Sequence, residues 1–141
     1  MQYLDTSALV AALTNEPRTA EVQAWLADQP TGELVISDWV VTEFSGAMSI
    51  KLRTGALEAS HRADALAMFT SLCESSLIVL PVERDDFRTA AHLANQFEAD
   101  LRSGDALHLA VASNHGLRIQ SLDQGLVADA ERMGVSARLI Q

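Results

Sequence analysis

The chain has 141 residues, and 48% of them are hydrophobic, which is the composition of one globular domain rather than of a disordered segment. Its 19 acidic and 10 basic side chains give a formal net charge of −9 at pH 7, which argues against strong nonspecific binding to nucleic acid. No apolar run is long enough to span a bilayer, no signal segment precedes the first expected strand, and the single cysteine, Cys73, excludes an internal disulfide. We therefore expect a cytoplasmic protein without a membrane association.

Short apolar runs alternate with helical patterns along the chain. In chain order, we expect a strand at 3–4, helices at 8–13 and 17–30, a strand at 34–36, and helices at 38–54 and 58–75. A strand at 77–80, helices at 83–99 and 103–116, a strand at 117–122, a helix at 124–133 and an edge strand at 137–140 follow. This alternation predicts a single α/β domain over residues 1–141, with a mostly parallel sheet of four to five strands and helices on both faces.

Two carboxylates, Asp5 and Asp123, each follow an expected strand directly. Because the carboxyl ends of parallel strands meet at one edge of a sheet, we expect these two side chains to lie near each other. Each is also a good N-cap for the helix that comes next. Ala8 stands three residues after Asp5, so the first helix has no capping box.

Two further carboxylates lie in expected helices. Glu43 lies inside helix 38–54, which is apolar around most of its circumference, and burying an unpaired ion there would cost several kcal/mol. The alternative is a carboxylate at the wet margin of that helix. Asp105 opens helix 103–116 ahead of an apolar run; the alternative is a first-turn acid favoured by the helix dipole, an effect of under about 1 kcal/mol.

Together the four acids predict a metal site. A like-charged pair about 4 Å apart costs roughly 4 kcal/mol at an effective dielectric near 20, so such a cluster takes up protons or holds divalent cations. An all-oxygen set without paired His or Cys suits Mg²⁺, with Mn²⁺ as a substitute. Ser7 and Ser121 place hydroxyls beside the cluster, where they could orient water, although ordinary turn or cap bonding also explains them.

Four stretches, in this order, resemble the PIN domain and, more narrowly, VapC-type toxins of bacterial toxin–antitoxin pairs. They are Leu4–Ala8, Glu43 within its long helix, Gly104–Ala110 and Ser121–Asp123. The resemblance covers nearly the whole chain and implies a PIN-like three-layer sandwich. Many relatives carry Thr where Ser121 stands, which retains the hydroxyl.

The resemblance also implies an activity. It is that of a Mg²⁺-dependent endoribonuclease, which cleaves a phosphodiester in structured RNA by metal-activated water. It implies a homodimer and a cognate VapB-type antitoxin whose tail occludes the site. By the match, the metal-site acids are Asp5, Glu43, Asp105 and Asp123, and Ser7 is the small hydroxyl near the metal.

Three nearby residues have secondary roles in this prediction. Glu98 and Asp100 are candidates for extra or substitute ligands because they lie just upstream of Asp105. His108 is expected to be a packed helix residue rather than a general base.

The polar run 83–86 is expected to be a solvated helix start, and Cys73 to lie on a buried helix face.

Three alternatives remain open from the residues. A haloacid-dehalogenase-like phosphatase needs a second Asp two residues after Asp5, where Ser7 stands. A non-catalytic RNA- or protein-binding PIN module would explain the acidic surface, but it has no reason to retain four mutually repelling acids. A metal-dependent DNA nuclease fits as well as a ribonuclease, since no residue in the sequence is seen to recognise a 2′-hydroxyl.

Overall fold

The computed structural model describes residues 1–141 and contains five strands and seven helices. The strands are β1 Gln2–Leu4, β2 Leu34–Ser37, β3 Ile78–Leu80, β4 Arg118–Ser121 and β5 Ala137–Leu139. The helices are α1 Thr6–Leu13, α2 Thr19–Ala27, α3 Asp38–Arg53, α4 Ala59–Ser75, α5 Arg84–Ala94, α6 Ser103–Asn114 and α7 Gln124–Arg132. None of these helices combines the length and apolarity that crossing a bilayer requires.

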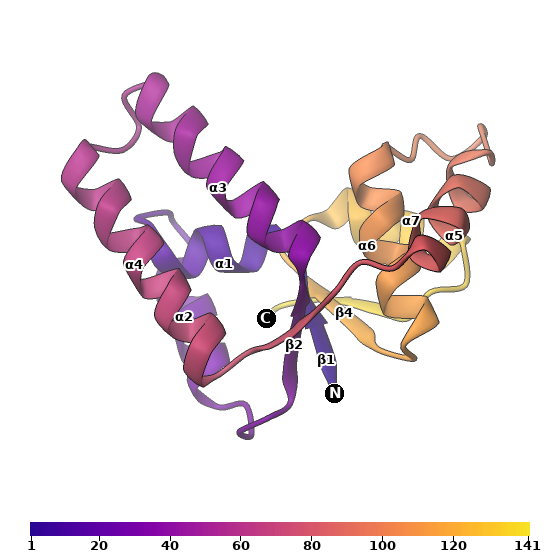
Figure 1. Ribbon diagram of the computed structural model, residues 1–141, viewed down its shortest axis with the longest axis horizontal. Coiled ribbons are helices and arrows are strands. Elements are labelled where there is room, and N and C mark those ends of the chain that lie inside the picture. Colours follow the sequence, from indigo (N-terminus) through magenta and orange to yellow (C-terminus); the bar gives the residue numbers. More distant parts are fainter.

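The strands form one sheet in the order β3-β2-β1-β4-β5, and every neighbouring pair is parallel. Parallel strands require crossover connections, which are almost always right-handed. The chain moves outward from β1 in one direction and later returns to add β4 and β5 on the other side. The connecting helices therefore lie on opposite faces, with α1 to α4 on one and α5 to α7 on the other (Figure 1). This three-layer α/β arrangement confirms the predicted fold class.

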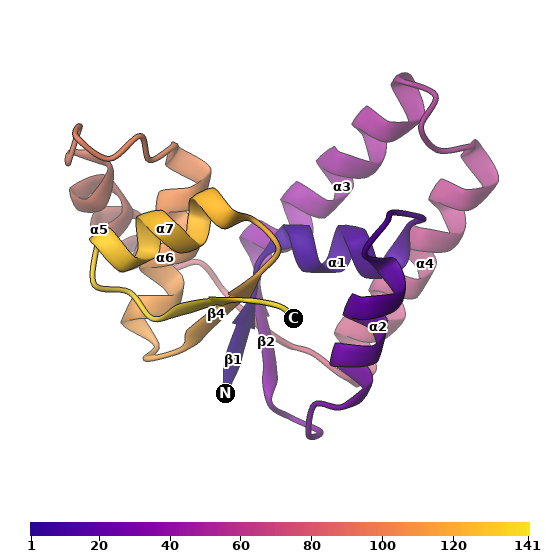
Figure 2. The ribbon, with the colours of Figure 1, turned by 180° about the vertical axis from the view of Figure 1, so that it is seen from behind.

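The central strand β1 is the most enclosed part of the sheet. Tyr3 lies in register with Val35 of β2 and Ile119 of β4, and all three side chains are buried. The apolar helix α1 follows at once and packs against α3 and α4 on one face of the sheet (Figure 2). The core is thus built around the first strand and first helix of the chain, and the residue between them, Asp5, is drawn into the interior.

Helix α5 ends earlier than the sequence predicts. The helix was expected to continue to residue 99, but it ends at Ala94, and short turns follow in which Gln96 donates to the carbonyl of Leu93. The reason is tertiary, because α6 packs closely on α5 and the chain must turn between them.

Of two side-chain expectations, the one for the polar run 83–86 needs correction. Asp86 is buried rather than solvated, since it completes a capping box with Glu83 and accepts a bond from Asn114 Nδ2 at 2.8 Å. Its partner lies on α6, which covers that side of the helix start. Cys73 lies partly buried on the face of α4 that packs against the core, as expected, and burial raises the pKa of its thiol.

Candidate active site

The candidate site lies at the carboxyl edge of the sheet, where the strand order reverses between β1 and β4. In open parallel sheets this switch point is where ligands bind. Asp5 follows β1 and caps α1, accepting a bond from Ala8 N at 3.4 Å. Asp123 follows β4 and caps α7, accepting from Leu126 N at 3.1 Å. The N-cap interpretation of both residues is therefore correct. Because β1 and β4 are adjacent, both caps lie at the carboxyl edge of the sheet.

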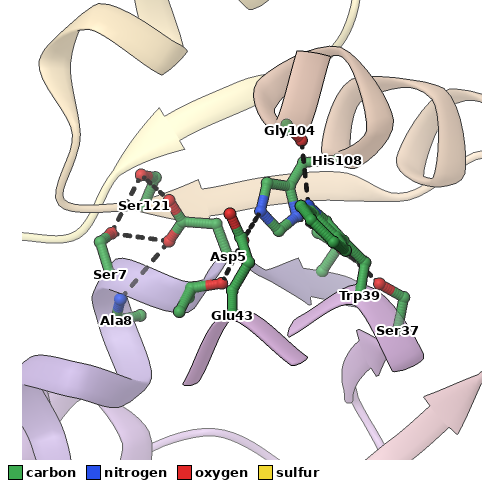
Figure 3. Close-up of polar contacts among 11 residues, drawn as sticks. Asp5, Ser7, Ala8, Ser37, Trp39, Glu43, Gly104, His108 and Ser121 are labelled. Atoms are coloured by element: carbon green, nitrogen blue, oxygen red, sulfur yellow. Dashed lines mark hydrogen bonds and ion pairs between the residues drawn. The ribbon is translucent and has the colours of Figure 1, made fainter. Parts of the chain in front are cut away.

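Asp5 is held in place by two serines (Figure 3). It is 4% exposed; Ser7 donates to its Oδ1 at 2.7 Å, and Ser121 donates to its Oδ2 at 2.7 Å. The same serine oxygens accept the backbone N–H groups of Leu122 and Asp123. Burial raises the pKa of Asp5, although the hydroxyl bonds oppose that effect. The two serines thus combine turn bonding with positioning of the buried acid.

Glu43 of α3 is paired rather than solvated. Its Oε1 lies 2.5 Å from His108 Nε2 and accepts a bond from Thr6 Oγ1 at 2.6 Å. Burial acts to raise the pKa of Glu43, but the hydrogen bond and charge of His108, together with the bond from Thr6, outweigh it and hold that pKa below its usual value. The side chain is 29% exposed, so it lies at the boundary between core and solvent.

His108 is the partner that the sequence did not identify. It is buried, as expected of a packed helix residue, and its Nδ1 lies 2.8 Å from the hydroxyl of Tyr3. That hydroxyl also lies 2.8 Å from Ser37 Oγ. The available signal was His108 itself, the sole polar side chain in the apolar stretch 106–112. A buried polar group of this kind requires a partner.

The other three acids affect the pKa of Asp105. It is half-buried at the start of α6, and burial raises the pKa of its carboxyl. His108 opposes this rise, whereas the negative charges of Asp123, Glu43 and Asp5 add to it. Residues from the start, middle and end of the chain therefore share one electrostatic environment.

The four acids are gathered, but they are not arranged around one point. No group of three or more His, Cys, Asp or Glu side chains lies close enough together to hold a metal ion. The carboxylates of Asp5 and Glu43 are instead bonded to hydroxyls and to His108, and that of Asp123 caps α7. The donor set, which is all carboxylate and hydroxyl oxygen, has the chemistry of a Mg²⁺ or Mn²⁺ site.

One wall of the site is a close contact between α3 and α6. Trp39 Nε1 donates to the carbonyl of Gly104 at 3.2 Å. A Cβ added at Gly104 would lie 3.3 Å from the Trp39 ring and 3.4 Å from Glu43 Oε2, so a glycine suits this position. Trp39 and Gly104 also line an apolar cavity of about 360 Å³ that Phe87 borders. No local pattern in the sequence indicates this contact, because its two residues are 65 positions apart.

The two secondary candidates lie outside the helices and strands that carry the four acids. Glu98 and Asp100 are exposed on the connection between α5 and α6. Glu98 lines a different cavity, together with Arg132 at the end of α7.

Comparison with known proteins agrees with this architecture. The family profile of the PIN domain matches residues 2–131. No curated protein matches the chain significantly in sequence. FitAcB from Neisseria gonorrhoeae superimposes with a TM-score of 0.71 at 20% identity, over 97% of this chain and 96% of that one.

Two further solved structures are similar. The Mycobacterium tuberculosis toxin VapC20, described as cleaving the sarcin-ricin loop, has a TM-score of 0.73 at 21% identity and covers 91% of this chain and 94% of its own. A DNA-bound VapBC from Salmonella typhimurium has a TM-score of 0.74 at 15% identity, with complete coverage of both chains. At these identities the similarity establishes the fold, and the profile match establishes the family. The chain belongs to the PIN domain family.

Proposed function

We propose that this protein is a Mg²⁺-dependent endoribonuclease and the toxin of a VapBC-type pair. The observation that carries the proposal is geometric: Asp5 and Asp123 follow the adjacent strands β1 and β4, and Glu43 lies between Thr6, which donates to it, and Gly104, the residue before Asp105. The N-cap bonds of Asp5 and Asp123 do not require two further acids beside them, and each added like charge destabilises the others. A reaction that needs divalent cations does explain the gathering of four acids.

Each residue has a stated role in this proposal. Asp5, Glu43, Asp105 and Asp123 are the ligands, and Ser7 and Ser121 orient Asp5 through its two oxygens. A bound Mg²⁺ would polarise the scissile phosphate and promote ionisation of water beside it. His108 is not the general base, because both ring nitrogens are engaged, with Tyr3 and with Glu43.

The partners follow from the relatives and from the charge. Several similar structures are toxin–antitoxin complexes, including one from Klebsiella pneumoniae and a VapBC2 bound to promoter DNA from Rickettsia felis. We propose a VapB-type antitoxin as the partner, an RNA as the substrate, a homodimer and a cytoplasmic location. The net charge of −9 is complementary to a basic partner segment, which would bind an acidic site more readily than free RNA does.

The activity can be tested with purified protein. Structured RNA, single-stranded RNA and DNA of the same sequence are incubated with Mg²⁺, with Mn²⁺ or with EDTA, and the products are sized. We expect cleavage of RNA that requires the metal. Cleavage of DNA alone would identify a DNA nuclease, and cleavage that persists in EDTA would contradict the metal-dependent mechanism.

Asp5→Asn should abolish cleavage while the fold persists. The amide keeps the size of the buried side chain but removes a charged ligand, so the rate should fall at least about a hundredfold, since metal catalysis supplies several kcal/mol. Cleavage rates and circular dichroism of both proteins provide the measurement. The control is Glu131→Gln, an exposed acid on α7, which should retain the full rate. Retained turnover in Asp5→Asn would remove Asp5 from the mechanism.

A further inference from the structure

A continuous chain of hydrogen bonds runs from the interior of the sheet to Glu43. It begins at Ser37 in β2, passes through Tyr3 in β1 and His108 in α6, and reaches Glu43 in α3; the successive distances are 2.8, 2.8 and 2.5 Å. Ser37, Tyr3 and His108 are all buried. This series of hydrogen bonds therefore connects the two central strands β1 and β2 with α6 on one face of the sheet and with Glu43 of α3 on the other.

The direction of these bonds follows from the chemistry of the groups. A carboxylate only accepts, so His108 Nε2 carries the proton that it shares with Glu43. Burial raises the pKa of the Tyr3 hydroxyl, which keeps its proton. When the imidazole is neutral, Nδ1 accepts from Tyr3, and when it is protonated, Nδ1 donates to Tyr3. Nε2 donates to Glu43 in both forms.

Both donors use the same carboxylate oxygen. His108 Nε2 and Thr6 Oγ1 bond to Oε1 of Glu43, whereas no hydrogen bond within the chain reaches Oε2. Oε2 lies on the side of Gly104, 3.4 Å from where a Cβ of that residue would be. The network thus occupies one oxygen and leaves the other beside the first turn of α6, where Asp105 is located.

We propose that His108 and Tyr3 are positioning residues, which hold Glu43 by Oε1 so that Oε2 stays free for a divalent cation. The proposal rests on the proposed function, because the cation belongs to that function. Packing alone would not require these groups, since an apolar side chain at 108 would fill the same space without the cost of burying an imidazole and a carboxylate together. Fixing the orientation of the Glu43 carboxylate, by contrast, requires a hydrogen-bond donor where His108 Nε2 lies.

Three variants separate positioning from packing. His108→Leu keeps an apolar core but removes the donor to Glu43. His108→Gln returns an N–H donor near the position of Nε2, and Tyr3→Phe removes only the hydroxyl behind the imidazole. The matched control is Ile36→Val, a fully buried neighbour of Ser37 in β2 that loses one methylene and makes no polar contact with the network.

The first measurement is the Mg²⁺ concentration that gives half of the maximal melting-temperature shift and half of the maximal cleavage rate. We expect His108→Leu to raise both concentrations about tenfold, which is the loss of one hydrogen bond to a charged group. His108→Gln should recover most of this loss, and Tyr3→Phe should give Mg²⁺ concentrations between those of the wild type and His108→Leu. Ile36→Val should lower the melting temperature without changing the Mg²⁺ concentrations. An equal metal response in His108→Leu and Ile36→Val would refute the positioning role.

The second measurement distinguishes failure of this inference from failure of the proposed function. Nitrogen-detected NMR of the metal-free protein should show a His108 Nε2–H protected from exchange, and Tyr3→Phe should weaken that protection. A wild-type chain that neither cleaves RNA nor responds to Mg²⁺ refutes both the proposed function and the cation part of the inference. If the wild type does both but His108 carries its proton only on Nδ1, the inference alone is refuted.

Discussion

At the scale of single residues, the carboxylates of the candidate site differ in how well their charged forms are stabilised. Asp5 is buried and depends on two serine hydroxyls, whereas Glu43 depends on His108 and Thr6. At Asp105, burial and the neighbouring negative charges outweigh the opposing charge of His108 and raise the pKa of the carboxyl. The electrostatic cost of assembling the site is therefore most visible at Asp105, where removal of the charge should be easiest to measure.

Asp105→Asn should stabilise the metal-free protein at neutral pH. The pKa of Asp105 is raised from 3.8 in the folded state, so the folded protein binds its proton more tightly than the unfolded chain. Stability falls as the pH rises through 3.8 toward the folded value, and the loss is complete above that value. Urea unfolding in EDTA at several pH values should show a gap between variant and wild type that is absent at the most acidic pH and full at pH 7.

A matched control isolates the environment of Asp105. Asp64→Asn removes an exposed carboxylate on α4, far from the other acids in sequence, and should not reproduce this pH-dependent gap. A gap for Asp105→Asn that grew toward acidic pH would mean that the folded protein stabilises the charged form, which would contradict the mutual repulsion described here.

At the scale of elements, α3 and α6 meet at the site although they lie on opposite faces of the sheet. Trp39 and Glu43 are one turn apart on α3, and both face Gly104 in the first turn of α6. The rest of α3 extends away from this contact in a hairpin with α4 (Figure 1). The two glycines in these helices therefore have different constraints, since Gly46 faces open space and Gly104 does not.

Gly46→Ala should stabilise the protein. Nothing lies within 4 Å of a Cβ at Gly46, and alanine in a helix interior is favoured over glycine by about 0.5–1 kcal/mol. The melting temperature should rise by about 2–4 °C for a chain of this size. Gly104→Ala is the matched contrast: its Cβ would crowd Trp39 and Glu43, so it should give no such gain and should weaken cleavage. Equal stabilisation by both changes would show that the α3–α6 contact tolerates a methyl group.

At the scale of the whole molecule, the acidic site lies within an acidic protein. The chain has a net charge of −9, and the two helical layers meet over the β1–β4 edge, where both layers contribute acids. Such a molecule repels polyanions unless cations or a basic partner intervene. The proposed metal and the proposed antitoxin thus act on the same electrostatic feature.

Millimolar Mg²⁺ should raise the melting temperature, because a ligand that binds only the native state stabilises it, by about 2.7 kcal/mol at a hundred times its Kd. Thermal melts with MgCl₂ are compared with melts in NaCl of equal ionic strength, since screening of like charges alone also stabilises an acidic protein. Asp5→Asn should lose the Mg²⁺-specific part of the shift. Identical curves in the two salts would contradict a divalent site.

The sequence by itself determined the fold class and predicted the four acids of the candidate site. Alternating apolar runs and helical periods are encoded in short windows, so nearly every strand and helix is where the pattern predicts it. Acids that follow strands of a parallel sheet must share its carboxyl edge, which is why Asp5 and Asp123 could be placed together from the sequence. The PIN resemblance rested on these same local motifs.

Only the tertiary structure decided which side chains are partners. Tyr3 and His108 are 105 residues apart, and Glu43 and His108 are 65 apart, so neither pair leaves a local pattern. The same holds for the early end of α5 and the burial of Asp86, both set by packing against α6. Hydrogen bonds at such separations depend on the strand order and on the helix faces that the order brings together, and a sequence window contains neither.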